Sequence, residues 1–273
     1  MNGRYVAALG CGGRVRVMAV VIDGPAEEMR TRHTLAPNAA VVAAEGLVAS
    51  VLLAAHVKGE ERLSVDVQSE DPTLSFAADV NGDGTIRARM RPPQLPPGRT
   101  LRGMLSVAKS LGPRELYRGV SEVRGERFEA ALQRYLTSSQ QVDARVRIQA
   151  DLDGEGRVNF AAGLLVERLP DFAGEEFAAV FDGAFAADFR ELMTAFAFGQ
   201  LVGEALEVLG TRDIVFACTC SRERVLTMIR SLGPDEIRSM IAEQGRAEVT
   251  CHYCNERYEV SEAELTALLS HFE

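Results

Sequence analysis

The hydrophobic positions of the first 170 residues alternate with polar ones in several short segments, the pattern of half-buried β-strands. Two pairs of these segments flank the turn sequences Asn81-Gly82-Asp83-Gly84 and Asp153-Gly154-Glu155-Gly156, which predict hairpins. The segments that we interpret as strands are residues 14–23, 63–68, 74–80, 85–90, 117–123, 142–152 and 157–169.

Residues 39–57 form the longest apolar stretch of the chain, and Glu45 and His56 interrupt it. The stretch barely reaches the length of a membrane span, so it predicts a buried core helix, with Asn38 as its N-cap. An amphipathic helix is expected over residues 126–136. Strands and helices in this order indicate an α+β fold. We therefore expect a mixed α/β core domain over residues 1–170.

The pattern changes after residue 170. Residues 171–210 show no strand alternation, and seven of the twelve phenylalanines lie between residues 171 and 210. Four of them recur at intervals of four residues and predict one apolar stripe on a helix: Phe177, Phe181, Phe185 and Phe189. We expect residues 171–217 to form a helical linker that docks through this stripe.

The last 56 residues, 218–273, form a third segment. Their pattern predicts a helix over 222–231, a helix from Pro234 to a C-cap at Gly245, a hairpin over 247–260, and a helix that begins with a Ser261–Glu264 capping box. A segment of this size buries too little apolar surface to be stable alone, so we expect a small domain held by a metal ion.

Four of the five cysteines of the chain fall in this segment as two close pairs, Cys218 with Cys220 and Cys251 with Cys254. Two such turns can form the tetrahedral tetrathiolate site that Zn²⁺ prefers. The same pairs could also close two local disulfides, and a disulfide across one intervening residue is strained and reversible. A structural zinc ribbon and a redox switch are therefore both open. We assign no role to Cys11.

Charge and motif content argue against several other functions. The net charge of −9 argues against broad binding to nucleic acids or acidic membranes. Residues 218–273 carry six Arg and ten Asp or Glu, which argues against a zinc ribbon that binds nucleic acid. The sequence has no Walker A lysine motif, and the two turn sequences lack the terminal Glu of a calcium loop.

A thiol–disulfide oxidoreductase is the remaining alternative. It would need a Cys-X-X-Cys at the start of a helix in a βαβ unit, whereas Cys251 and Cys254 are expected in a hairpin turn. We therefore expect no enzymatic activity. We find no targeting segment and expect the protein in the cytoplasm, where thiols stay reduced.

The segment Phe216-Ala217-Cys218-Thr219-Cys220-Ser221-Arg222-Glu223-Arg224, followed by Cys251-His252-Tyr253-Cys254, resembles the redox switch of the thirty-three-kilodalton heat-shock chaperonin family. Members of this family are bacterial holdase chaperones that oxidation activates. Residues 38–57, 63–80, 117–120 and 132–136 are also similar to the core domain of that family, so the resemblance covers nearly the whole chain.

The resemblance implies that Cys218, Cys220, Cys251 and Cys254 hold one Zn²⁺ per chain in the reduced form. It implies that oxidation pairs Cys218 with Cys220 and Cys251 with Cys254. It also implies ATP-independent binding of unfolding proteins, a homodimer when oxidised, and release of clients to ATP-driven chaperones. If loss of zinc unfolds the C-terminal domain, the phenylalanine stripe would lose support and become a client surface.

Overall fold

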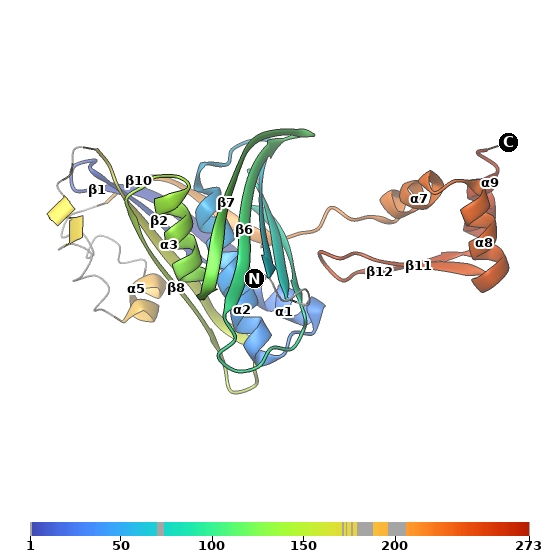
Figure 1. Cartoon of the computed structure of the whole chain (residues 1–273), viewed down its shortest axis with the longest axis horizontal. Coiled ribbons are helices and arrows are strands. Elements are labelled where there is room, and N and C mark those ends of the chain that lie inside the picture. Colours follow the sequence, from blue (N-terminus) through green and yellow to red (C-terminus); the bar gives the residue numbers. More distant parts are fainter. Residues whose placement is uncertain are drawn as a thin grey trace. The chain divides into compact units, whose positions relative to one another are not determined.

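A buried helix, α2 (Pro37–Leu53), is the centre of the N-terminal fold in the computed structural model (Figure 1). Its alanine, valine and leucine side chains are apolar on every face, which is the pattern of a helix surrounded by protein. Residues Pro37–His56 are long and apolar enough to cross a membrane, but 78% of the most apolar window is buried inside the protein. The prediction of a core helix is therefore confirmed.

The N-cap of α2 is Ala36, with Pro37 in the first turn, and not the predicted Asn38. Pro37 occupies a position where a helix needs no N–H donor, so the helix starts two residues earlier than expected. The Asn38 side chain instead donates a hydrogen bond of 3.1 Å to the carbonyl oxygen of Leu95.

The structure describes residues 2–69, 74–170, 172, 174–175, 177–178, 188–195 and 206–272. The chain forms two compact units, Met1–Ala217 and Cys218–Glu273. The strands of the first unit are β1 (Gly3–Gly10), β2 (Val15–Val21), β3 (Glu61–Ser69), β4 (Ser75–Asn81), β5 (Thr85–Arg91), β6 (Leu101–Leu111), β7 (Arg114–Glu126), β8 (Ala144–Leu152), β9 (Val158–Arg168) and β10 (Glu207–Phe216). Helices among its described residues include α1 (Asp23–His33), α2, the 3₁₀ turn η1 (Ala54–His56), α3 (Phe128–Ser138) and α5 (Phe189–Ala195).

These ten strands form one sheet in the order β7-β6-β3-β4-β5-β10-β1-β2-β9-β8. All neighbours are antiparallel except β5 and β10, which are parallel and share only the pairs Val215–Thr85 and Phe216–Ile86. The sheet therefore consists of two five-stranded halves joined at a short seam. Helix α2 packs against strands of both halves. This arrangement confirms the predicted α+β class.

Strand β10 differs from the sequence prediction, which placed residues 207–217 in a helical linker. It pairs with β1 along nearly its whole length and reaches the centre of the sheet. Among its side chains only Ile214 is buried, while Val208 and Leu209 are exposed, so the segment lacks the alternation that marks a strand. Pairing with a distant strand, and not local pattern, determines its conformation. Strands β1 and β6 and helix α1 were not predicted either.

The prediction of one continuous helix from Phe177 to Phe189 is also wrong, because a separate helix begins at Phe189. Helix α5 begins at Phe189, and the Asp188 side chain before it accepts hydrogen bonds from the backbone N–H of Arg190 and Glu191 at 2.9 and 3.2 Å. An Asp in this position caps a new helix start, so residues 177 and 189 do not share one helix. Phe181 and Phe185 lie outside the described residues.

Two layers of apolar side chains cover the faces of the sheet. One contains α2 together with residues such as Tyr5, Met18 and Val20. The other lies on the opposite side of β1, β2 and β9, because alternate residues of a strand point to opposite faces. Its buried members include Val17, Phe160, Phe172, Phe177 and Phe189.

The second unit follows the predicted order. Its elements are α7 (Arg222–Ser231), α8 (Pro234–Gln244), β11 (Arg246–Thr250), β12 (Arg257–Ser261) and α9 (Glu262–Leu269). Gly245 ends α8 with a φ of 64°, and both hydrogen bonds of the Ser261–Glu264 capping box are present. The small core of this unit consists of Val225, Ile229, Ile237, Ala247, Val260, Leu265 and Leu268.

Gly46 lets two aromatic rings approach α2 directly. A Cβ atom at this position would lie 2.7 Å from ring atoms of Phe76 and 2.8 Å from Phe128, whose rings pack edge to face at 5.0 Å. We predict that Gly46→Ala lowers the free energy of unfolding of the first unit by about 1–3 kcal/mol, because the core is overpacked. Denaturant titration measures this change.

The matched control is Gly154→Ala, since no atom lies within 4 Å of a Cβ built at this exposed turn residue. It should leave the unfolding midpoint nearly unchanged. Equal midpoints for Gly46→Ala and the wild type would contradict the packing argument.

Candidate metal centre

Two loops of the second unit carry the four cysteines. Cys218 and Cys220 lie between β10 and α7, and the N-cap of α7 is Ser221, whose side chain accepts a hydrogen bond of 3.3 Å from the Arg224 N–H. The cap residue directly follows Cys220, and the helix begins at Arg222. The first cysteine pair therefore lies in the short loop that leads into α7.

Cys251 and Cys254 lie in the turn between β11 and β12, as predicted. The Cys251 N–H donates to the Glu256 carbonyl at 2.9 Å, and the Asn255 N–H donates to the Cys251 carbonyl at 2.8 Å. Asn255 has a φ of 59°, a left-handed conformation that asparagine tolerates better than most residues. The turn thus holds both cysteines on one side of the hairpin end.

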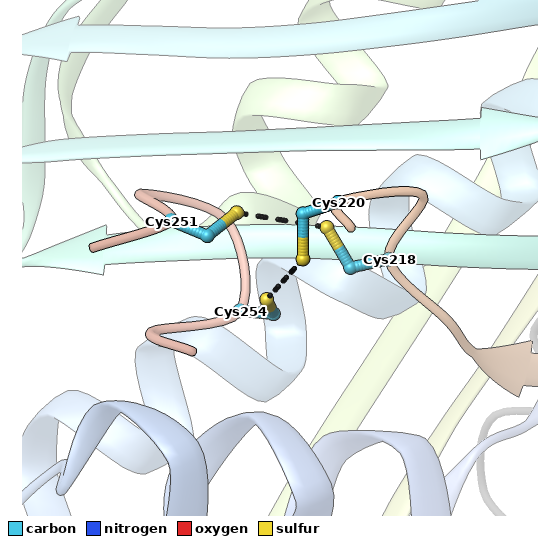
Figure 2. Close-up of side chains that lie close together, drawn as sticks. All are labelled: Cys218, Cys220, Cys251 and Cys254. Carbon is cyan, nitrogen blue, oxygen red and sulfur yellow. Dashed lines mark hydrogen bonds between the residues drawn. The ribbon is translucent and has the colours of Figure 1, made fainter. Parts of the chain in front are cut away.

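The four sulfurs converge (Figure 2). All four Sγ atoms lie within 4.8 Å of one another. The Cys218 and Cys251 Sγ atoms are 3.7 Å apart, and the Cys220 and Cys254 Sγ atoms are 3.3 Å apart. Zn–S bonds of about 2.3 Å in a tetrahedron place the sulfurs about 3.8 Å from one another. The cysteines are free thiols, and their spacing fits a ligand set for one metal ion.

The environment of the sulfurs is partly apolar and partly open. Cys254 is buried, whereas the other three cysteines are half-buried. Burial raises the pKa of the Cys254 thiol, and the neighbouring sulfurs raise it further. Four adjacent thiolates are therefore unfavourable unless a cation holds them. A metal ion at the centre of the cluster would supply that positive charge.

Tyr258 of β12 contacts the cluster from the hairpin side. Its hydroxyl donates a hydrogen bond of 3.2 Å to the Cys220 Sγ, and this contact raises the pKa of the tyrosine. Hydrogen bonds to ligand atoms orient them and tune their basicity. Sequence analysis did not single out Tyr258, because the contact crosses between two loops and no spacing pattern indicates it.

An ion pair fixes the helix after the first loop to the last helix. The Arg222 guanidinium donates to the Glu264 carboxylate at 2.7, 2.8 and 3.0 Å and to the Glu259 carbonyl at 2.9 Å. Hydrogen bonds from Arg222, and then from the N–H and hydroxyl of Ser261, lower the pKa of Glu264 to about 2. Arg222 follows Cys220 by two residues, so this pair also positions the first loop.

Other candidates from the sequence lie apart from the cluster. Cys11 is buried in the first unit, against β-strand residues such as Val15 and Val17. His252 is exposed and is not a member of the group of converging ligands. Phe177 and Phe189 are buried in the first unit, at 1% and 2% exposure.

The sequence of the chain matches the family model described as Hsp33 protein over residues 4–261. The chain belongs to the Hsp33 family. Among curated members, the 33 kDa chaperonin of Bacillus subtilis is 31% identical over 281 residues, which cover 96% of this chain and 97% of the relative. The 33 kDa chaperonin of Desulforamulus reducens is 29% identical over 299 residues, which cover 100% of this chain and 99% of the relative.

The fold is also that of a solved Hsp33 structure. The Heat shock protein 33 homolog of Thermotoga maritima, described as a 33 kDa chaperonin, aligns with a TM-score of 0.85 and 23% identity. The alignment covers 99% of this chain and 98% of that one. The family resemblance inferred from the cysteine segments is therefore confirmed, and the names of the curated Hsp33 members support a chaperone role.

We predict that Glu264→Gln destabilises the second unit at pH 7, because the charge-assisted hydrogen bonds from Arg222 weaken. The folded-state pKa of Glu264, about 2, lies below the ordinary value of 4.5. The stabilisation by the carboxylate is therefore present above pH 4.5 and lost as the pH falls towards 2. The difference in stability of the second unit between wild type and Glu264→Gln should shrink as the pH falls from 4.5 towards 2. Hydrogen exchange of α7 and α9 amides measures it.

Glu262→Gln is the matched control, since Glu262 lies on the same helix and has the same charge but makes no ion pair within the described part of the chain. If both variants lower amide protection equally, the Arg222–Glu264 contact does not stabilise the unit.

Proposed function

We propose that the chain is a redox-regulated, ATP-independent holdase, in which the four cysteines hold one Zn²⁺ while reduced. The observation that carries the proposal is the convergence of four free thiols within 4.8 Å in a unit of 56 residues. Thiolates are the ligands that Zn²⁺ prefers, and family membership supports the chaperone role. We place the protein in the cytoplasm, where such thiols stay reduced.

Zinc would dominate the stability of the second unit. Its core contains seven buried apolar residues, which is small for an independent domain. A structural Zn²⁺ supplies about 10–16 kcal/mol of apparent binding free energy, whereas whole domains are stable by about 5–15 kcal/mol. Loss of the ion would therefore unfold this unit.

Oxidation would remove the ligands. For each pair, two thiolates lose two electrons and form one S–S bond, and hydrogen peroxide takes those electrons with two protons to give two molecules of water. We propose the pairs Cys218–Cys220 and Cys251–Cys254. In the reduced structure the Sγ contacts of 3.7 and 3.3 Å join the two loops, whereas each proposed disulfide lies within one loop. Short disulfide loops restore little chain-entropy stabilisation.

We propose that the phenylalanine stripe becomes a surface that binds client proteins after the cysteines are oxidised. In the described residues, Phe177 and Phe189 pack on the first unit and guanidinium groups cover them: Arg145 lies 5.8 Å from the ring centre of Phe177, and Arg147 lies 4.5 Å from that of Phe189. Exposed phenylalanine rings capture other unfolded chains, because large apolar patches bind apolar partners. Phe181 and Phe185 belong to the same proposed surface.

The remaining partners follow from the same proposal. The oxidised form would be a homodimer that releases clients to ATP-driven chaperones, without nucleic acid, membrane or enzymatic turnover. An oxidoreductase would instead reduce insulin disulfides catalytically. A holdase suppresses aggregation of a heat-denatured protein near stoichiometric ratio, and only after oxidation.

We predict that Cys220→Ser reduces bound zinc well below one ion per chain, because the site loses one of its four thiolates. Elemental analysis of the purified, reduced protein measures the stoichiometry, and proteolysis measures the folding of residues 218–273. The control is Cys11→Ser, which changes the one cysteine outside the cluster. If the wild type binds no zinc, or if Cys220→Ser keeps a full ion, the proposed site is wrong.

We predict that a photo-crosslinking phenylalanine analogue at position 189 captures denatured clients only after peroxide treatment at mild heat. Position 76 serves as the control, because Phe76 is 1% exposed in the core beside α2 and should stay buried in both states. Crosslinking at position 189 that is equal before and after oxidation would contradict conditional exposure.

A further inference from the structure

A hollow of about 420 Å³ lies in the first unit, away from the cysteines. Strands β1, β2 and β10 contribute one side of it, and the end of η1 with the following residues contributes the other. Its volume falls within the range of about 300–1,000 Å³ typical of small-molecule pockets. We refer to it as the basic pocket, after the charged residues that line it: Arg16, His56, Lys58 and Arg212.

The charge of the basic pocket contrasts with that of the chain. The net charge of the protein is −9, yet three permanent cations and one histidine line this hollow. Among the described residues that line it, none is Asp or Glu. A recess lined by one sign of charge concentrates ions of the opposite sign. The basic pocket therefore attracts anions in spite of the overall acidity.

Two of the cations are held in place and two groups are free to bind. Arg16 forms an ion pair of 2.8 Å with Glu167 of β9, and Arg212 donates a hydrogen bond of 3.0 Å to the Val57 carbonyl. The Lys58 ammonium and the His56 ring have no hydrogen-bond or ion-pair partner within the described part of the chain. The site thus combines oriented guanidinium groups with two groups that have no partner among the described residues.

The neighbouring charges also act on His56. Partial burial lowers its pKa, and the charges of Arg16, Lys109 and Lys58 lower it further, whereas Glu167 acts in the opposite direction. The imidazole therefore lies in a positive field that a bound anion would offset. Its ring signals can report occupancy directly.

A strand irregularity shapes the rim of the basic pocket. Ala7 of β1 pairs with Gly210 and Ala8 pairs with Val208, which leaves Leu209 without a partner in a β-bulge. Bulges redirect side chains and often occur beside binding sites. Leu209 is 53% exposed and lines the hollow, so an apolar side chain lies beside the cations.

We propose that the basic pocket binds a small phosphate-bearing molecule. Two guanidinium groups and an ammonium match a phosphate dianion better than a singly charged carboxylate. The apolar side chains of Met18, Ala55 and Leu209 would contact a compact organic group attached to the phosphate. This site is independent of zinc and of the proposed client surface.

The test uses the full-length, reduced, zinc-loaded protein, with inorganic phosphate, adenosine monophosphate and adenosine as probes in calorimetry. Both phosphate probes should bind saturably and more weakly as salt is raised, whereas adenosine should not bind. Lys58→Gln should weaken binding by about five- to tenfold, because one charge contact is lost. Arg114→Gln is the control, since it removes one exposed charge outside the basic pocket.

Histidine ring signals in NMR show whether phosphate binds in the basic pocket. The His56 signals, identified by their loss in His56→Gln, should shift with phosphate, whereas those of His33, which lies 3.1 Å from the Ala88 carbonyl, should not. Absence of saturable binding by both phosphate probes would overturn the proposal. Equal weakening by Lys58→Gln and Arg114→Gln, or unchanged His56 signals at saturation, would also overturn it.

Discussion

We propose that the second unit depends on one constraint, the convergence of its four sulfurs. Two loops that are about thirty residues apart in sequence meet at contacts of 3.7 and 3.3 Å between their sulfurs. Around them, the Tyr258 hydroxyl and the Arg222–Glu264 pair fix the same loops from the outside. With so small an apolar core, the unit has few other sources of stability. We therefore propose that its folded state is sensitive to the chemistry of these thiols.

The first unit is stabilised in a different way. Its core surrounds α2, whose side chains are buried on every face, and Gly46 allows aromatic rings to pack against the helix backbone. The second apolar layer, on the opposite face of β1, β2 and β9, includes Phe172, Phe177 and Phe189. A change in the second unit therefore leaves the α2 core with its own contacts.

The local sequence pattern predicted the helices whose ends are marked by capping residues. Gly245 ends α8 in a left-handed conformation, and the Ser261–Glu264 capping box starts α9. Both features act through residues close in sequence, and both were predicted. The cysteine spacing likewise predicted the cluster. Strand β10 was missed because pairing with β1, two hundred residues away in sequence, determines its conformation. Tyr258 and the basic pocket were missed because they combine residues from separate elements, which no single pattern connects.

Strand β10 ends two residues before Cys218, and its last residues pair with β5 at the seam of the sheet. The second unit is therefore attached to the centre of the first unit, and not to a loose terminus. If its 56 residues unfold, they form a tethered arm with a fixed origin, and its fully extended reach is about 190 Å. Because the arm stays joined to the sheet at Phe216, its residues would sample only the space within that reach of the seam.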